Sequence, residues 1–360
     1  MAIRFPQLGF YTLPGRVSDP KPMLHEVKDA EAVGLGSVWI SERQDVKEAA
    51  TLSGAAGALT SELAIGVGVT NPNTRHIMLT AAIGSTMSAL TGGRFVLGLG
   101  RGFDLRSDMW GVPRVTGKML ADTAGLLRRL WAGEKVFGHD GPAGKFAYLS
   151  LDTVVEQPPP LFLAALGPRT QELAGQHFDG VLLHSHWTDR AVAECVARVR
   201  KGAERAGRDP ERAQVWSCLV TACALPESVE LRHVVRRMTT YMQIPGYGEL
   251  IVDANGWDRG VLEKLRNHPL LQGRFADATE FSDDELRQIR DVYPREWLEQ
   301  SNAVGSAEHC ARRILDQFAA GAAGVVLHAS APREMTALLA AYAAVRDAGR
   351  FSGRSAVPGR

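Results

Sequence analysis

The 360-residue chain has few cysteines, almost no net charge and no long apolar run. Its four cysteines have no CxxC spacing, which argues against a zinc finger or a disulfide framework. With 41 basic and 40 acidic residues, the formal net charge is +1. Electrostatics therefore give no reason to expect nucleic acid or an anionic membrane as a partner. We expect free buried thiols in a reducing compartment.

No apolar stretch reaches the eighteen or so residues that a membrane span needs, and the N-terminus lacks the apolar segment of a signal peptide. We therefore expect a cytoplasmic protein that does not contact membranes. Hydrophobic residues make up 45% of the chain, enough to bury a large core. The length fits two average domains or one large α/β barrel.

The stretch 63–102 is the most informative part of the sequence. Residues 63–69 are an apolar, β-branched run, and Gly66 and Gly68 within it favour a strand over a helix. The polar turn 71–74 then precedes a helix that starts near Arg75 and stops at two glycines. A second apolar run, 95–99, completes a βαβ unit with two parallel strands.

Both strands of this unit end in glycine and polar residues. Gly68 is followed by Thr70 and Asn71, and Gly100 and Gly102 follow the second strand. The carboxyl ends of strands are where α/β proteins bind ligands. Since glycine has no Cβ, a flat ring or a phosphate can approach its backbone closely. The alternative is that these glycines only permit tight packing of the barrel.

Strands and helices alternate along the rest of the chain, which predicts a (β/α)₈ TIM barrel over residues 1–348. We expect a hairpin excursion at 133–160, a helical insertion at 243–304, an irregular loop at 103–117 and a disordered tail at 349–360. The expected strands are 5–11, 37–41, 63–69, 95–99, 161–165, 180–184, 215–224 and 324–329.

Histidines two positions apart, His184 and His186, follow the sixth expected strand. Such a pair can bind a metal, but we find no third ligand and predict no metal site. His184 is instead a candidate contact for substrate or cofactor, or a hydrogen-bonded core residue. His328, at the end of the last strand, is likewise a candidate ligand contact or a hydrogen-bonded core residue. Trp110 either lines a substrate pocket or only packs within its loop.

Five segments together resemble the bacterial luciferase-like superfamily, and within it the coenzyme F420-dependent oxidoreductases more than the FMN-dependent monooxygenases. The segments are EAVGLGSVWISER, LAIGVGVTNPNTRH, TGGRFVLGLGRG, LFLAALGPRTQELAGQHFDGVLLH and VGSAEHCARRILDQFAAGAAGVVLH. The resemblance runs from about residue 5 to 345. It implies a TIM barrel with a flavin or deazaflavin ring at its carboxyl-terminal face.

The resemblance also assigns cofactor contacts. It implies a non-prolyl cis peptide between Gly68 and Val69, behind the ring, and places Thr70 and Asn71 near the ring's polar edge. A helix start offers N–H groups to the cofactor phosphate, and an arginine adds charge for a polyanionic tail. The complete set of expected cofactor contacts is Gly68, Val69, Thr70, Asn71, Gly100, Gly102, Ala165, Gly167, Pro168 and Arg169.

Two positions depart from the pattern of the F420-dependent enzymes. Many of them have an acidic residue and a histidine after the second strand, where this chain has Glu42 and Arg43. A guanidinium stays charged, so a histidine's proton-transfer role does not carry over to Arg43. Phe103 stands where the sugar-phosphate dehydrogenases have a catalytic glutamate, which argues against a sugar phosphate substrate.

The catalytic candidates are therefore Glu42, Arg43 and His184, and the alternative for Glu42 is an ion pair with an arginine. Three functions stay open: an F420-dependent oxidoreductase acting on a small organic molecule, an FMN-dependent monooxygenase, and a cofactor-binding protein without turnover. The resemblance implies a homodimer. Small residues that would allow close helix packing are Ala49, Ala50, Gly54 and Gly57.

Overall fold

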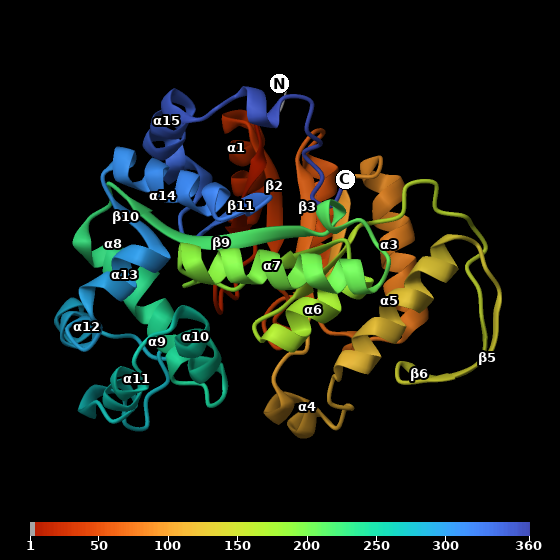
Figure 1. The fold of residues 1–360 in the computed structure, drawn as a ribbon, viewed down its shortest axis with the longest axis horizontal. Coiled ribbons are helices and arrows are strands. Elements are labelled where there is room, and N and C mark those ends of the chain that lie inside the picture. Colours follow the sequence, from red (N-terminus) through yellow and green to blue (C-terminus); the bar gives the residue numbers. More distant parts are fainter. Residues whose placement is uncertain (1–3) are drawn as a thin grey trace.

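The computed structural model describes residues 4–360 and contains a closed barrel of eight parallel strands (Figure 1). The sheet runs β10-β9-β11-β1-β2-β3-β4-β7-β8, and pairing between β8 and β9 closes it, so that β10 lies outside the ring beside β9. The predicted TIM barrel is confirmed. Its strands are β1 (Phe5–Thr12), β2 (Leu35–Ile40), β3 (Ala64–Thr70), β4 (Phe95–Leu99), β7 (Leu161–Ala164), β8 (Gly180–Leu182), β9 (Gln214–Cys223) and β11 (Gly324–His328).

Helices follow the strands, and several of them begin at side-chain caps. In α3, the His76 ring accepts the N–H of Met78 and the helix ends at Gly92, whose φ of 60° suits glycine. Thr116 caps α5 in the same way. The helices packed around the barrel are α1 (Met23–Val33), α2 (Ala49–Leu59), α3 (Ile77–Thr91), α5 (Gly117–Trp131), α6 (Pro168–His177), α7 (Asp189–Arg205), α14 (Ala307–Ala319) and α15 (Thr336–Val345).

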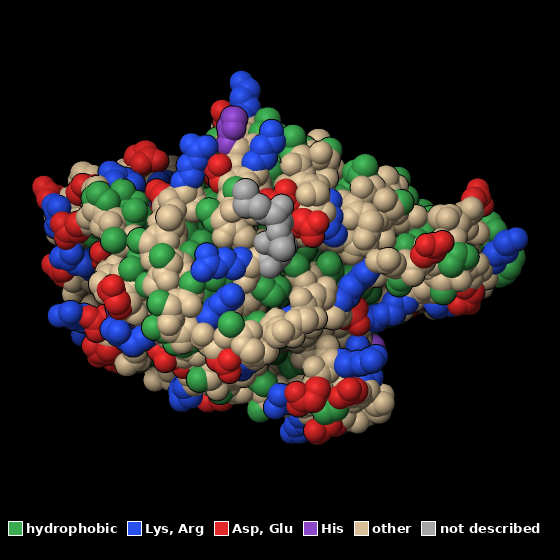
Figure 2. Space-filling model, turned by 90° about the horizontal axis from the view of Figure 1, so that it is seen from above, with side chains coloured by type: hydrophobic (Ala, Val, Ile, Leu, Met, Phe, Trp, Pro, Cys, Tyr) green, Lys and Arg blue, Asp and Glu red, His purple; other side chains and the backbone are tan. Residues whose placement is uncertain are grey.

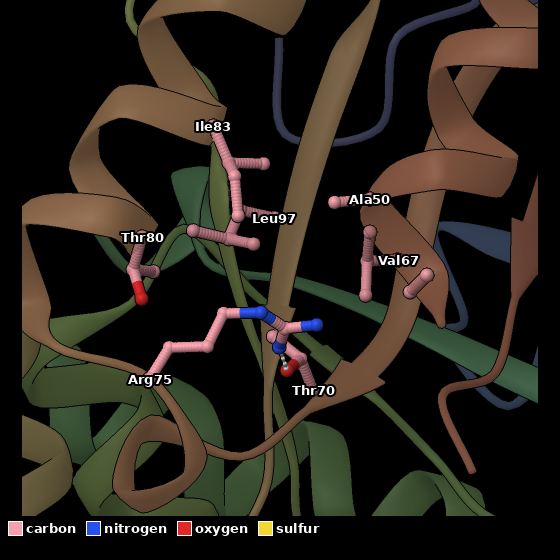
Figure 3. Close-up of a pocket in the computed structure, with 8 residues that line it drawn as sticks. Ala50, Val67, Thr70, Arg75, Thr80, Ile83 and Leu97 are labelled. Carbon is pink, nitrogen blue, oxygen red and sulfur yellow. Dashed lines mark hydrogen bonds between the residues drawn. The ribbon is translucent and has the colours of Figure 1, made fainter. Parts of the chain in front are cut away.

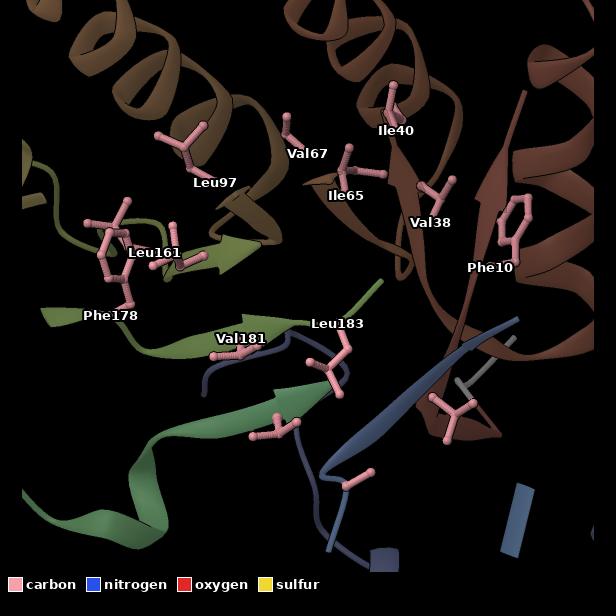
Figure 4. Packing of buried hydrophobic residues seen from close by; sticks show 14 of the residues in the cluster. Phe10, Val38, Ile40, Ile65, Val67, Leu97, Leu161, Phe178, Val181 and Leu183 are labelled. Atoms are coloured by element: carbon pink, nitrogen blue, oxygen red, sulfur yellow. The ribbon is translucent and has the colours of Figure 1, made fainter. Parts of the chain in front are cut away.

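The core has two layers because successive strand residues point to opposite faces. The outer layer lies between strands and helices and includes Phe10, Val38 and Leu97 (Figure 4). The inner layer fills the barrel around Trp39, whose ring centroid lies 5.6 Å from that of Phe162. The barrel is therefore a packed core, and space for a ligand is confined to its mouth.

Residues between α5 and β7 form an antiparallel hairpin of β5 (Val136–Gly141) and β6 (Gly144–Leu149). It extends away from the barrel at the right of Figure 1. The exposed rings of Phe137 and Tyr148 pack on each other across the two strands, with centroids 4.9 Å apart.

A helical insertion follows β9 and has its own apolar core, which includes Leu231, Met238, Ile251 and Ile289. It begins at Glu227, earlier than the expected 243, although the apolar residues Leu231, Val235, Met238 and Met242 already recur at helical spacing in the sequence. Strand β10 (Asn302–Gly305) ends it. Its elements are α8 (Glu227–Glu230), a π-helix (Leu231–Arg236), α9 (Arg237–Met242), α10 (Tyr247–Asn255), α11 (Arg259–Arg266), α12 (Asp283–Arg290) and α13 (Arg295–Ser301).

The loop expected at 103–117 contains a short helix, α4 (Asp104–Trp110), which ends at Gly111 with φ 66°. Only Ser107 of this helix is buried, so its sequence has no apolar period to predict it. Helix α4 and helices α9–α11 lie on the same side of the barrel, at the bottom of Figure 1. This is the side of the carboxyl ends of the strands.

The last residues differ from the disordered tail that the sequence suggested. A 3₁₀ turn, Gly349–Phe351, buries the Phe351 ring 5.0 Å from that of Phe318. The Arg360 guanidinium donates to the side-chain oxygen of Gln157, at 2.7 Å. One aromatic anchor and these hydrogen bonds hold a tail that is polar in composition.

Figure 2 shows Lys and Arg side chains interspersed with Asp and Glu over one face of the molecule, as the net charge of +1 suggests. Within residues 4–360, no helix is both long and apolar enough to cross a membrane.

Candidate functional site

Hydrogen bonds connect the ends of β2, β3 and β4. The Glu42 carboxylate accepts the hydroxyl hydrogen bond of Thr70. Asn71 donates through Nδ2 to the Gly100 carbonyl at 2.9 Å, and Gln44 donates to Asn71 Oδ1 at 3.0 Å. The two glycine-rich strand ends that the sequence singled out therefore form one connected edge of the barrel mouth.

The peptide bond between Gly68 and Val69 is cis, as the resemblance implied. The Tyr11 hydroxyl donates to the Gly68 carbonyl at 2.8 Å. A Cβ on Gly68 would lie 2.7 Å from the Tyr11 oxygen, and one on Gly100 would lie 2.5 Å from Cγ2 of Val69. Close packing therefore requires glycine at both positions, against Tyr11 for Gly68 and against Val69 for Gly100, and such packing is the role that the sequence left as the alternative to ligand contact.

Glu42 is fully enclosed, with a side-chain exposure of 0%. Arg75 reaches from the start of α3 and donates to the Glu42 carboxylate (2.8 Å for Nη1–Oε2) and to the Thr70 hydroxyl (Figure 3). Arg75 also pairs with Glu48. The ion pair considered for Glu42 is therefore present, and its partner is Arg75. The small cavity of Figure 3 lies between α2 and α3, away from the barrel axis.

Arg43, the next candidate, points toward the insertion and pairs with Asp277 at 3.1 Å. Beside it, the Lys47 ammonium is buried and donates to the carbonyls of Leu13 and Gly15. Burial, followed by the charge of Arg43, lowers the pKa of Lys47 to about 8. Arg43 thus links the end of β2 to the insertion.

His184 and His186 contact different partners. The His184 ring packs edge-on against Tyr241, with centroids 4.0 Å apart. The His186 ring instead pairs its Nδ1 with Oδ1 of Asn302 at 3.0 Å. Burial, then the charge of Arg237, lowers the pKa of His184 to about 3, so this ring is neutral near pH 7. Within residues 4–360, no three His, Cys, Asp or Glu side chains are grouped to hold a metal ion.

The carboxyl ends of β1, β8 and β11 meet the insertion in a group of side chains that we call the mouth cluster. Its rings lie 4.0 to 5.7 Å apart, as in the pairs Tyr11–His328 (5.0 Å) and Tyr241–Tyr247 (5.7 Å). The mouth cluster consists of Tyr11, His184, Arg237, Tyr241, Tyr247 and His328.

Sequence reasoning found the histidines of the mouth cluster but missed Tyr11 of β1 and, in the insertion, Arg237, Tyr241 and Tyr247. The last three come from the insertion, where no strand end marks a site. Phe103, at the position where the resemblance led us to look for a glutamate, packs its ring 5.4 Å from that of Tyr247. Trp110 is 40% exposed and lies under the Arg106 guanidinium, at the edge of the same side.

The expected phosphate-binding segment lies at the start of α6. Gly167 caps this helix with its backbone only, and Pro168 is its first residue. Arg169 is exposed and forms no ion pair within the described part of the chain. Ala165 is buried just before this turn, and Gly102 has a left-handed φ of 66° beside Asn71.

A family model described as luciferase-like monooxygenase matches residues 7–350. The chain belongs to this family. The cis bond at Gly68 and the closed barrel agree with the resemblance read from the sequence.

Curated relatives in the family include a 5,10-methylenetetrahydromethanopterin reductase of Methanolobus tindarius, which is 35% identical over 204 residues. That match covers 55% of this chain and 60% of the reductase. An F420-dependent hydroxymycolic acid dehydrogenase of Mycobacterium tuberculosis is 34% identical over 194 residues, covering 50% of this chain and 53% of the dehydrogenase. The chain therefore matches less than two thirds of each of these relatives.

Among solved structures, the coenzyme F420 dependent tetrahydromethanopterin reductase of Methanopyrus kandleri superposes with a TM-score of 0.75. The match covers 95% of this chain and 98% of that one, at 19% identity. At this identity the likeness establishes the fold and no more.

Proposed function

We propose that this protein is an F420-dependent oxidoreductase that transfers a hydride between the deazaflavin and a small organic substrate. The observation that carries the proposal is the match to a curated relative whose name states F420 dependence, at 34% identity over half of this chain. The family membership of residues 7–350 supports it.

The residues at the barrel mouth fit a flat, polar-edged ring. Ala164 at the end of β7 and Gly100 just after β4 carry little or no side chain, and the Val69 side chain packs against Gly100. A buried nitrogen of the mouth cluster, Nδ1 of His328, has no hydrogen-bond partner within residues 4–360. Buried polar atoms without partners are rare, and they suit a ligand with polar atoms.

In this proposal, Val69 would support one face of the ring, held by the Tyr11 contact to Gly68 and by the Glu42–Thr70 hydrogen bond. The start of α6 and Arg169 would bind the cofactor phosphate. Thr70 and Asn71 already bond to protein groups, so we assign them to shaping the strand ends as well as to facing the ring.

When bound, the deazaflavin supplies the carbon that gives or accepts the hydride. His184 is neutral near pH 7 because its pKa is about 3, so it serves as a hydrogen-bonding group rather than a proton donor. The Tyr241 oxygen accepts a hydrogen bond from Arg237 at 3.0 Å. Its own proton is therefore directed away from Arg237 and is available to a substrate oxygen.

For Glu42 and Arg43, the geometry favours positioning over chemistry. Glu42 is saturated by Arg75, Thr70 and the backbone N–H of Ala49. Arg43 is held by Asp277. We therefore propose that Glu42 fixes the bulge at Val69 and that Arg43 fixes the insertion over the mouth.

The test is turnover with reduced F420. Purified protein is mixed with reduced F420 and a panel of small ketones, enones and unsaturated acids, and reoxidation is followed by deazaflavin absorbance without oxygen. Reoxidation that depends on one class of substrate supports the proposal. Oxygen consumption with reduced FMN instead supports the monooxygenase, and tight F420 binding with no reoxidation by any acceptor supports the non-catalytic binder.

A homodimer remains part of the proposal. Of the small residues on α2, Ala49 and Gly57 are buried within the chain, and a Cβ on Gly57 would meet Thr91 at 2.8 Å. Gly54 has no neighbour within 4 Å of its Cβ position, and Leu79 on the adjacent α3 is 59% exposed. Light scattering on the eluting protein tests this: a mass near twice 39.0 kDa is expected.

A further inference from the structure

Arg237 is a cation of the mouth cluster without an acidic partner. Its Nη2 donates to the Tyr241 hydroxyl at 3.0 Å, and its guanidinium lies 5.2 Å from the centroid of the Tyr241 ring. Its Nε is buried and has no acceptor. No carboxylate within residues 4–360 lies within ion-pair distance of it.

Neighbouring arginines of the insertion are paired. Arg232 contacts Asp283 at 2.9 Å, and Arg236 contacts Glu280 at 3.4 Å. A buried donor left without an acceptor is destabilising. Arg237 therefore differs from its neighbours on the same stretch of chain by holding an N–H group that the protein itself does not satisfy.

The charge of Arg237 is directed at the barrel mouth. Burial lowers the pKa of His184 and His328, and the charge of Arg237 is the next cause in each. The same charge opposes the rise that burial imposes on the pKa of Tyr11. With these histidines neutral, Arg237 supplies the positive charge within the mouth cluster.

The rings around this charge are flat and apolar. Tyr247 lies 5.7 Å from Tyr241, and Phe103 lies 5.4 Å from Tyr247. Aromatic faces of this kind pack well against a planar unsaturated group. A guanidinium next to them binds a carboxylate side-on, through Nε and one terminal nitrogen. Arg114 binds Asp108 in this way elsewhere in the chain, with Nε–Oδ1 at 2.8 Å.

We propose that Arg237 binds a carboxylate of the substrate, and that the substrate is a planar unsaturated or aromatic acid whose apolar part lies on Phe103, Tyr241 and Tyr247. This assignment rests on the proposed function, in which the protein reduces or oxidises a small organic substrate. It adds the charge and the shape of that substrate. The free Nε and a terminal nitrogen of Arg237 bind the two carboxylate oxygens, and the Tyr241 hydroxyl lies beside them.

The test compares two probes of one shape and different charge, trans-cinnamate and trans-cinnamamide. Their dissociation constants are measured by calorimetry on the full chain, with and without F420. The wild-type protein is expected to bind cinnamate at least tenfold more tightly than cinnamamide. Arg237→Met should abolish this preference. Arg237→Lys should keep part of it, because lysine retains the positive charge but lacks the two parallel N–H donors of the guanidinium.

Arg232→Met is the matched control, since it removes an arginine of the same segment that is paired with Asp283 at the surface. It should keep the wild-type preference. Thermal unfolding shows whether each variant is folded. If Arg237→Met does not fold, Arg237→Lys alone is compared with the wild type. Equal binding of the two probes by the wild type, or an unchanged preference in both Arg237 variants, would overturn the assignment.

Binding of F420 is measured on the same variants and separates this assignment from the proposed function. Arg237→Met should leave the F420 dissociation constant within about threefold of wild type. If it weakens F420 tenfold and leaves cinnamate unaffected, Arg237 belongs to the cofactor and the assignment fails. If the wild type does not bind F420, the proposed function fails, while the cinnamate preference still decides the role of Arg237.

Discussion

The enclosed Glu42 carboxylate and the Arg75 guanidinium, whose side chain is 17% exposed, form an ion pair that joins the end of β2 to the start of α3. Glu42 also accepts from Thr70, so the pair holds the strand end that follows the cis bond at Val69. The shape of the barrel mouth therefore depends on a contact made outside the barrel.

Removing one member of this pair should be costly. Arg75→Met leaves the Glu42 carboxylate buried and unpaired, and we expect a loss of about 3–5 kcal/mol in the free energy of unfolding. The double variant Glu42→Gln/Arg75→Met should recover part of that loss, because no uncompensated charge remains. Urea denaturation of the four members of the cycle measures the coupling. Additive single effects would contradict the account.

Substitution by alanine should destabilise the protein at Gly100 but not at Gly54. A Cβ at position 100 would lie 2.5 Å from Val69, so Gly100→Ala should cost about 1–3 kcal/mol by overpacking. In the proposed function, it should also weaken F420 binding at least tenfold by displacing Val69. Gly54→Ala meets nothing within 4 Å in α2 and should gain roughly 0.5–1 kcal/mol. Thermal denaturation and F420 titration of both variants test this, and equal effects would contradict it.

Stability should fall as the solution is acidified below neutrality. The pKa of His184 is about 3 in the folded state, and burial also lowers those of His186 and His328. The unfolded chain therefore binds more protons once the pH falls below the usual histidine pKa of about 6.5. The contribution of these histidines to the free energy of unfolding is fully present above about pH 6.5 and is lost as the pH falls below it. Between pH 7 and pH 5.5 the loss is roughly 1 kcal/mol for each histidine.

His328→Phe tests this dependence, because it keeps a ring beside Tyr11 and removes one titrating group. Its free energy of unfolding should change about 1 kcal/mol less than that of the wild type over the same pH range. His25→Gln, at an exposed position on α1, should behave as the wild type. If His328→Phe has the same pH dependence as the wild type, protonation of His328 does not contribute to the loss of stability at acidic pH.

Arg169 should bind the anionic part of the cofactor. In the proposed function, Arg169→Gln should weaken F420 binding by about fivefold, close to 1 kcal/mol, and reduce its salt dependence. It should not alter binding of the deazaflavin chromophore without its phosphate tail. Arg205→Gln removes an arginine paired with Glu172 at 2.7 Å on the adjacent helix α7 and is the control. Equal losses for F420 and the chromophore would contradict the assignment.

The barrel was predictable because each strand is a short apolar run that ends in glycine or polar residues, and these runs recur with helices between them. The same logic located Gly68, Gly100 and His184 at the mouth. It could not find Arg237, Tyr241 and Tyr247, because they lie within an insertion whose helices pack on their own core and whose placement over the mouth depends on tertiary contacts such as Arg43–Asp277.

The sequence also could not choose between roles for a given residue. The sequence left Glu42 as either a catalytic candidate or a member of an ion pair, and its pairing with Arg75 depends on how the segment before α3 lies beside the end of β2. The tail beyond residue 348 is polar in composition, yet one ring, that of Phe351, is enough to anchor it. Residue types were therefore enough to predict candidate site residues, but the role of each residue depends on contacts between segments that are far apart in the sequence.

The most direct measurement is equilibrium binding of oxidised F420 and, separately, of FMN to the purified protein, followed by quenching of tryptophan fluorescence. The account predicts micromolar or tighter binding of F420 and at least tenfold weaker binding of FMN. A preference for FMN, or no binding of either molecule, would contradict it.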